Sequence, residues 1–284
     1  MAANYDIIRS WPTTPVRQRY SGRDTIIYNL GVGANVIEDA AHADLSLVWE
    51  ERLSPFPTFV TVLGVEPYWY SDARTGLDWR QSVHGEHSIE WHAPIGAEGE
   101  VVGRSSVEEL FDKGPGRGAL LAVRRTLSDA ATGQALATIR QGVFFRADGG
   151  FGGPTGARKP PRVPATAPDS VVSLATRPEQ ALIYRLSGDL FPLHVDPAFA
   201  VAGGFPAPIL HGLCTYAIAG RAVAAGLCDG HSERLKRLDA RFSAPVFPGE
   251  VIDTEMWRLE AGEGAYRCRV GERVVIDNGY VRFA

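Results

Sequence analysis

Alternating apolar and polar positions occur late in each half of this 284-residue chain. Residues 266–270 alternate between apolar and arginine side chains, the period of a sheet with one face in solvent. Residues 118–128 and 134–146 have the composition of two further strands, joined by a turn at 129–133. The pattern therefore predicts antiparallel sheet in both halves.

One long helix is predicted ahead of the late strands of the second half. It covers about residues 208–226, is rich in Ala and Leu, and has Gly226 in a position to end it. A single helix followed by antiparallel strands favours an α+β unit in which a sheet wraps round a central helix.

Three short motifs occur in the same order in both halves and indicate an internal duplication. They are Ala-Pro-Ile at 93–95 with Ala-Pro-Val at 244–246, Gly-Glu-Val at 99–101 and at 249–251, and the strand endings 142–146 and 279–283. Residues 149–164, rich in Gly and Pro, hold few side chains that pack and resemble a linker. We therefore expect an N-terminal domain over 1–148, a linker over 149–168 and a C-terminal domain over 169–284.

Composition narrows the class of protein. Hydrophobic residues make up 45% and charged residues 22%, which is typical of a globular protein with a core. No apolar run reaches eighteen residues, so no membrane span is expected, and residues 1–15 lack the pattern of a signal peptide. The net charge of −4, without a basic face, argues against nucleic-acid binding. Three cysteines without metal-ligand spacing suit a reducing compartment, and the last four residues are not a peroxisomal signal, so we expect a cytoplasmic protein.

The strongest chemical signal lies between residues 184 and 197. Asp189 and His194 are five residues apart, and Gly188 with two prolines forces turns around them. A bent segment of this kind can aim a carboxylate and an imidazole at one point, where they can hold water and transfer its protons. The alternative is an Asp–His hydrogen bond that only stabilises a surface turn.

A second signal lies at the start of the predicted helix, in residues 204–214. Unpaired amide N–H groups and the positive end of the helix dipole point outward there, which suits an oxygen that gains negative charge. Gly212 lacks a side chain, so a carbonyl oxygen can approach its N–H closely. The alternative is that Gly212 only relieves helix packing, with His211 as a cap or a packing residue.

The first half offers weaker signals. His84, Glu86 and His87 do not have the His-Glu-x-x-His order of a zinc helix, so no metal is expected. Lys113, beside a Gly-Pro turn, is either a solvated loop residue or a cation for a phosphate group. The chain has no P-loop or dinucleotide fingerprint, and Ser187 lacks the flanking glycines of a nucleophile elbow.

These residues together resemble the type-2 enoyl-CoA hydratases, the MaoC-like proteins with a double hot-dog fold. The resemblance covers nearly the whole chain, in motifs that follow one another in order: 23–24, 28–34, 57–59, 84–86, 112–114, 150–153, 185–197, 208–214 and 240–242. It implies a tandem α+β hot-dog fold, a homodimer, an acyl-CoA substrate and no separate cofactor.

The resemblance also implies roles for individual residues. The catalytic dyad falls on Asp189 and His194, and the oxyanion donor on the Gly212 amide. The N-terminal domain is expected to have lost catalytic residues and to make room for a bulky acyl chain. Substrate contacts are implied for His84, Gly85, Lys113, Leu190, Phe191, Pro192, Leu193 and Phe242.

One position departs from the family pattern. The dyad segment of the family carries Asn two residues after the Asp, where it helps to hold the reacting water, and this chain has Phe191, which offers no donor or acceptor. Slower hydration, takeover of the role by another group, and a pocket shaped for a branched or aromatic acyl group are the three interpretations. The sequence thus favours an (R)-specific 2-enoyl-CoA hydratase, a hydro-lyase, over an acyl-CoA-binding partner subunit that has lost catalysis or a thioesterase.

Overall fold

The computed structural model describes residues 3–34, 45–66, 68–156 and 163–284. Within these ranges all strands belong to one antiparallel sheet, in the order β1-β3-β4-β5-β2-β7-β10-β9-β8-β6. The strands are β1 (Val16–Tyr20), β2 (Ser82–Trp91), β3 (Gly99–Asp112), β4 (Ala119–Asp129), β5 (Ala135–Phe145), β6 (Ser170–Ala175), β7 (Leu235–Phe242), β8 (Val251–Arg258), β9 (Glu263–Val270) and β10 (Arg273–Phe283). The α-helices are α1 (Tyr5–Arg9), α2 (Gly22–Gly31), α3 (Gln180–Tyr184), α4 (Pro197–Ala202) and α5 (Gly212–Leu227).

The sheet consists of two halves with the same strand order. The first half runs β1-β3-β4-β5-β2, and the second, read from its outer edge, runs β6-β8-β9-β10-β7. The halves meet where β2 pairs with β7, from Glu86 opposite Arg241 to Glu90 opposite Arg237. The sequence motifs shared by the halves follow β2 and β7 and close β5 and β10, which are equivalent places. The topology thus confirms the duplication and the tandem hot-dog fold.

Most predicted elements are present, but both ends of the long predicted helix were placed wrongly. Strands β4 and β5 and the alternation in β9 match the sequence expectation. The helix, in contrast, begins at Gly212 rather than near Pro208, because His211 still has an extended backbone (φ −58°, ψ 136°). Gly226 does not end the helix either: it lies within the last turn, where a Cβ would overlap the Met256 side chain. Close packing of α5 against Met256 of β8 explains why residue 226 is a glycine.

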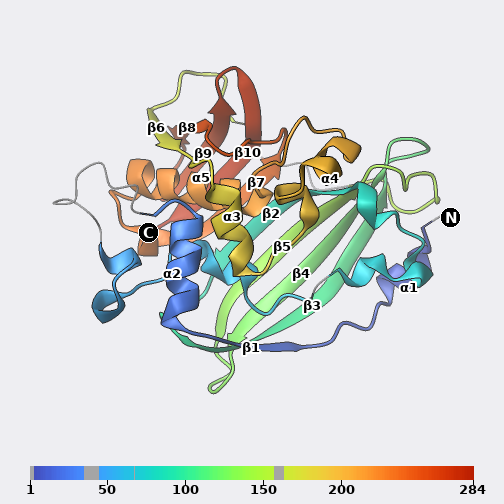
Figure 1. Cartoon of the computed structure of the whole chain (residues 1–284), viewed down its shortest axis with the longest axis horizontal. Coiled ribbons are helices and arrows are strands. Elements are labelled where there is room, and N and C mark those ends of the chain that lie inside the picture. Colours follow the sequence, from blue (N-terminus) through green and yellow to red (C-terminus); the bar gives the residue numbers. More distant parts are fainter. Residues whose placement is uncertain (1–2, 35–44, 67, 157–162) are drawn as a thin grey trace.

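Helices of both halves lie over the sheet and hold the region of the predicted dyad in place (Figure 1). The Gln180 amide donates to the backbone carbonyls of Leu30 and Gly31, at the end of α2. A Cβ on Gly31 would lie 3.0 Å from the Cα of Tyr184, so α2 and α3 approach closely. Helix α3 leads directly into the segment that carries Asp189, and the N-terminal half therefore supports it.

Two family-like motifs have structural roles in the N-terminal half. Asn29, fully buried, donates to the carbonyls of Leu47 and Ser54 and accepts from the Phe56 amide. Asp112, also buried, accepts from the amide of the nearby Gly114 and from those of Gly150 and Gly152, which are distant in sequence, each at 2.7 Å. The start of the predicted linker is thus attached to the end of β3, and residues 157–162 of that linker lie outside the described residues.

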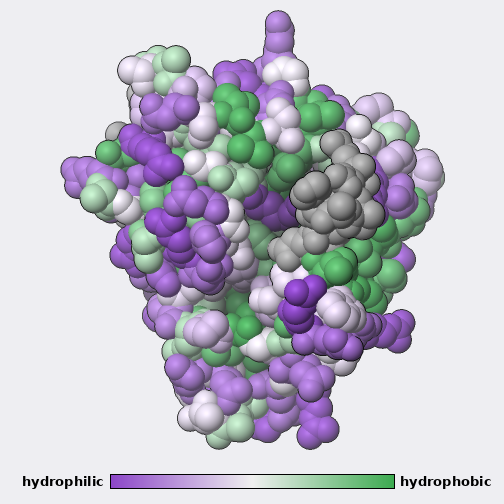
Figure 2. Space-filling view, turned by 90° about the vertical axis from the view of Figure 1, so that its left-hand side faces the viewer, coloured by the Kyte–Doolittle hydropathy of each residue, from purple (hydrophilic) through white to green (hydrophobic). Residues whose placement is uncertain are grey.

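The surface agrees with the mixed composition. Hydrophilic and hydrophobic residues are interspersed over the face that Figure 2 shows. Among the described residues, no helix is long and apolar enough to cross a membrane.

Gly103 of β3 provides a test of the close packing of β3 against Gly64. A Cβ on Gly103 would overlap the Gly64 carbonyl oxygen, and Gly64 itself has φ +59°. We expect Gly103→Ala to lower the free energy of unfolding by about 2 kcal/mol, because backbone atoms must move apart. Urea unfolding measures this change. Gly156→Ala is the control, since a Cβ there meets nothing within 4 Å, and equal stability of the two variants would contradict the prediction.

Candidate active site

A pocket of about 400 Å³ joins the two halves of the molecule. Its lining includes His84 of β2, Val123 of β4 and Val143 of β5 from the first half. Asp189, His194, Gly212 and Phe242 line it from the second half. The sheet therefore brings the dyad segment to a space that residues of both halves enclose.

The His194 ring is buried and fixed as a base. Its Nδ1 lies 2.9 Å from the Ile209 carbonyl oxygen, so Nδ1–H donates and Nε2 keeps its lone pair. Burial lowers the pKa of His194, although the Asp189 carboxylate opposes that shift. At neutral pH the imidazole is therefore neutral and can accept a proton.

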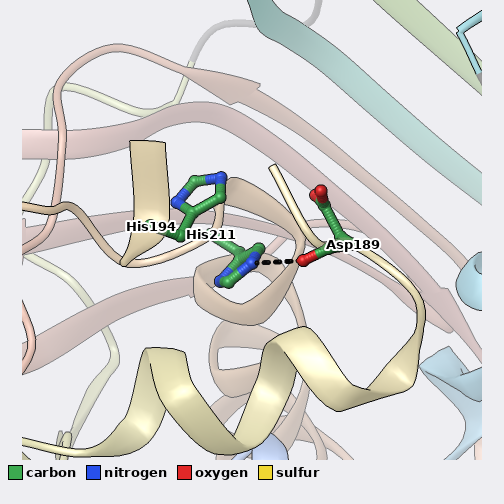
Figure 3. A group of neighbouring side chains, drawn as sticks. All are labelled: Asp189, His194 and His211. Carbon is green, nitrogen blue, oxygen red and sulfur yellow. Dashed lines mark hydrogen bonds between the residues drawn. The ribbon is translucent and has the colours of Figure 1, made fainter. Parts of the chain in front are cut away.

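Asp189 turns its carboxylate toward the pocket and its backbone toward His211. The carboxylate Oδ1 accepts from the Tyr68 hydroxyl at 3.1 Å and from the Phe191 amide at 3.3 Å. Its backbone carbonyl accepts from His211 Nε2 at 3.1 Å (Figure 3). Gly188, with φ +116°, supplies the turn that places Asp189 there.

The His211 ring packs against the face of the His194 ring. The two rings stack, with centroids 3.6 Å apart and planes 24° from parallel (Figure 3). Burial, followed by the neighbouring His194, lowers the pKa of His211 to about 3. A neutral His211 thus fixes the position of the His194 ring without adding a positive charge to it.

Gly212 is the first residue of α5 and lines the same pocket. Its N–H belongs to the first helical turn, which has no intrahelical acceptor. A Cβ at this position would lie 3.5 Å from the Phe242 ring, so the missing side chain leaves room beside that ring. An oxygen of a bound carbonyl group can approach the amide here.

The predicted substrate residues divide into two groups. His84, Phe191, Leu193 and Phe242 line the pocket, and His84 packs edge-on against Phe242 with centroids 5.2 Å apart. Gly85, Lys113, Leu190 and Pro192 are not among the lining residues. Leu190 is 59% exposed, and the Lys113 ammonium lies over the Phe111 ring. Lys113 is close enough to Glu86 to lower the pKa of that carboxyl group, which burial raises.

The pocket lining also includes residues that the sequence did not predict for the site, among them Tyr68, Trp79 and Arg125. His211 was considered only as a cap or packing residue, and it in fact contacts both members of the dyad. Tyr68 immediately precedes one short 3₁₀ segment and Trp79 begins another, and neither segment has a periodicity that would indicate them. Arg125 did carry a signal, because it follows the inward alternation of Leu121, Val123 and Leu127 in β4.

Asp189, His194 and His211 offer ligand atoms within 4.8 Å of one another, a spacing that a metal ion requires. The two rings stack, however, and each donates one N–H to a backbone carbonyl. Parallel rings do not direct their remaining nitrogens at one point, as tetrahedral coordination requires. The expectation of no metal and no separate cofactor stays a prediction.

Comparisons with known proteins agree with this geometry. Residues 18–147 match the family described as MFE-2 hydratase 2 N-terminal domain, and residues 160–278 match the MaoC like domain. The chain is 38% identical over 280 residues to 3-hydroxyacyl-thioester dehydratase Y of Mycobacterium tuberculosis, covering 95% of each chain. It is 34% identical to the peroxisomal enoyl-CoA hydratase 2 of Arabidopsis thaliana, covering 95% of this chain and 92% of the relative.

A solved structure described as a MaoC-like dehydratase from Phytophthora capsici superposes with a TM-score of 0.84. Sequence identity there is 34%, and 98% of each chain is covered. The chain therefore belongs to the MaoC-like dehydratase family, in the branch whose first domain is the hydratase 2 N-terminal domain.

The buried histidines predict a pH dependence of stability. Burial lowers the pKa of His84 to about 4, that of His211 to about 3 and that of His87 well below 6.5. The unfolded chain takes up protons near pH 6.5 while the folded protein does not, so stability is full above pH 6.5 and falls toward pH 4. Each such histidine contributes up to about 1.4 kcal/mol per pH unit.

Urea unfolding between pH 7.5 and pH 4.5 measures this slope. His87→Gln should reduce it, because one buried site no longer titrates. His231→Gln is the surface control and should change the slope less than His87→Gln does, since the His231 side chain is 64% exposed. A slope that is the same in all three proteins would show that His87 does not contribute.

Proposed function

We propose that this protein is an (R)-specific 2-enoyl-CoA hydratase, which adds water to the C2–C3 double bond of an acyl-CoA thioester and removes it from the 3-hydroxyacyl product. Membership in the MaoC-like family supports this function. The observation that carries it is the convergence of three groups on one pocket: the His194 imidazole, the Asp189 carboxylate and the amide of Gly212.

Each group has a distinct role in the proposed reaction. Asp189 holds the water, and His194 Nε2 accepts its proton as the oxygen bonds to C3. The electron pair of the double bond moves onto the thioester oxygen, which the Gly212 N–H stabilises. The imidazolium then returns the proton to C2, and the neutral enzyme is restored. Water and proton reach the same face of the substrate, because both come from one side of the pocket.

The role of the missing family Asn falls to Tyr68 in this proposal. Its hydroxyl donates to Asp189 Oδ1, and its ring lies against Phe191 with centroids 6.0 Å apart. Burial, then the Asp189 charge, raises the pKa of Tyr68, so the phenol remains a donor at neutral pH. Tyr68 adopts φ +43°, an uncommon conformation for a residue with a side chain, and this places its ring at the site.

Phe191 itself shapes the acyl pocket. It contacts Phe199, Tyr68 and Trp79, with ring centroids 5.3 to 6.4 Å apart. An aromatic wall beside the dyad favours bulky, branched or aromatic acyl groups, which gain more contact area there than a straight chain.

The remaining expectations belong to the same proposal. His84, Gly85 and Lys113 are assigned to the acyl-CoA, together with the segment from Leu190 to Leu193 and with Phe242. The homodimer and the cytoplasmic location rest on the family resemblance and on the composition of the chain.

Substitution of the dyad tests the activity. Purified protein is mixed with trans-2-enoyl-CoA esters, and loss of the conjugated-thioester absorbance is followed. We expect His194→Gln and Asp189→Asn to lower kcat about 10²- to 10⁴-fold, because each removes a proton-transfer or water-holding group. His231→Gln is the matched control and should retain full rate.

The product and the pH profile give further readouts. The 3-hydroxyacyl product should be the (R) enantiomer, and kcat/KM should fall only below pH 6.5, where His194 takes up a proton. Release of free thiol instead of hydration would assign a thioesterase. Binding of the esters with neither hydration nor dehydration would show that the protein binds acyl-CoA without catalysing the reaction.

The Tyr68→Phe variant tests whether the Tyr68 hydroxyl takes over the role of the family Asn that is replaced by Phe191 in this chain. We expect kcat to fall about tenfold or more with little change in KM, because one hydrogen bond at the reacting centre is lost. Adding Phe191→Asn to this variant should recover part of the loss, since the amide can hold the water again. If Tyr68→Phe retains full kcat, Phe191 shapes the pocket and Tyr68 has no part in the reaction.

A further inference from the structure

Arg125 is a buried cation in a pocket that is otherwise lined mainly by apolar side chains. It lies on β4, lines the pocket and is only 6% exposed. Its neighbours on the same face include Val123 of β4 and Ile139 of β5, and Ser105 of β3 is directly opposite it. Burial lowers its pKa to about 10, so the guanidinium remains charged at neutral pH.

The guanidinium uses only part of its donor capacity within the protein. Nη2 donates to the carbonyls of Thr61 at 2.6 Å and Val60 at 3.3 Å. Nε is buried and has no hydrogen-bond partner, and no ion pair to Arg125 is formed by a carboxylate in the described part of the chain. Glu66 also lines the pocket; its Oε1 accepts from the Thr14 amide, its Oε2 is buried without a hydrogen-bond partner, and it forms no ion pair with Arg125.

An unpaired buried charge is costly, and removal of water by a ligand raises that cost. A purely hydrocarbon acyl chain in this pocket would displace water from the guanidinium without supplying a hydrogen-bond acceptor or a negative charge. An acyl chain with an oxygen atom at this depth would satisfy the free N–H groups, and a carboxylate would also neutralise the charge.

Arg125 is not part of the dyad, although it belongs to the same continuous space. His84 is influenced by both charges: Asp189 raises its pKa and Arg125 lowers it, beneath the larger effect of burial. His84 therefore lies within reach of both groups. The thioester end of a substrate at Asp189 and the far part of its acyl chain at Arg125 would span this pocket.

We propose that Arg125 selects acyl-CoA substrates whose acyl chain carries an acceptor oxygen, foremost a carboxylate, beyond the double bond. This inference rests on the proposed hydratase function and specifies its substrate class. Gln141 of β5, which lines the pocket and pairs with Val123, two positions along β4 from Arg125, would donate to the same oxygen.

The test compares trans-2-enoyl-CoA esters of six to twelve acyl carbons in three matched series, ending in a methyl group, a methyl ester or a carboxylate. We expect the best carboxylate-ended ester to exceed the methyl-ended ester of equal length about ten- to a hundredfold in kcat/KM, the size of a hydrogen bond to a charged group. A preference for the neutral methyl ester over the methyl-ended chain also supports an acceptor-oxygen site.

Variants assign the preference to Arg125. In Arg125→Gln the ratio between carboxylate-ended and methyl-ended esters should collapse to about one, while Arg125→Lys, which keeps the charge, should retain part of it. Arg124→Gln is the matched control, because Arg124 immediately precedes Arg125 in β4 and its side chain is exposed. It should keep the full ratio.

The outcomes separate this inference from the proposed function. Hydration of methyl-ended esters that equals or exceeds that of both oxygenated series at every length overturns the inference and leaves the hydratase intact. Hydration of no ester overturns the function. If Arg125→Gln fails to fold because it loses its bonds to Val60 and Thr61, the wild-type series alone still decides.

Discussion

The site depends on the pairing of β2 with β7, which joins two similar half-sheets edge to edge. Unpaired strand edges expose amide and carbonyl groups, and here the two inner edges satisfy one another along five residue pairs. The same pairing sets His84 of β2 against Phe242 of β7. The lining of the pocket thereby continues from one half into the half that carries Asp189 and His194. Each half alone would hold only part of the pocket.

Burial then decides the electrostatics of this shared space. His84, His194 and His211 are held neutral because the cost of desolvation exceeds the attraction of Asp189, and His87 because burial and the neighbouring His84 and Arg125 all lower its pKa. Hydrogen bonds to backbone carbonyls fix which nitrogen of His194 is free, and the His211 ring fixes its plane. A neutral base beside a carboxylate is what the addition of water requires. The buried Arg125 is the exception, because its guanidinium stays charged at neutral pH and its Nε has no hydrogen-bond partner. A ligand with an acceptor oxygen would offset the free-energy cost of burying this charge.

The duplication explains why the two halves differ in function while they share a topology. Both contain a helix over a five-stranded antiparallel sheet. The bent segment with Asp189 and His194 occurs only between β6 and β7. In the first half the equivalent stretch, between β1 and β2, instead supplies Tyr68 and Trp79 to the pocket wall. Under the proposed function, one half would supply the dyad and the other would shape the space for the acyl chain.

The sequence by itself determined the strands of β4, β5 and β9, the duplication and the pairing of Asp189 with His194. The strands and the Asp189–His194 segment depend on local periodicity or on residues a few positions apart, where turns and side-chain alternation decide the outcome. The duplication was detectable because short motifs recur in the same order in both halves. The start of α5 was misjudged, because the extended backbone of His211 is set by contacts with Asp189 and Tyr184 rather than by propensity. Tyr68 lies 121 residues from Asp189 in sequence, and only the folded sheet brings their side chains together. The partners of Arg125 were likewise decided by tertiary structure, since local pattern can predict that a side chain is buried but not which groups remain unpaired around it.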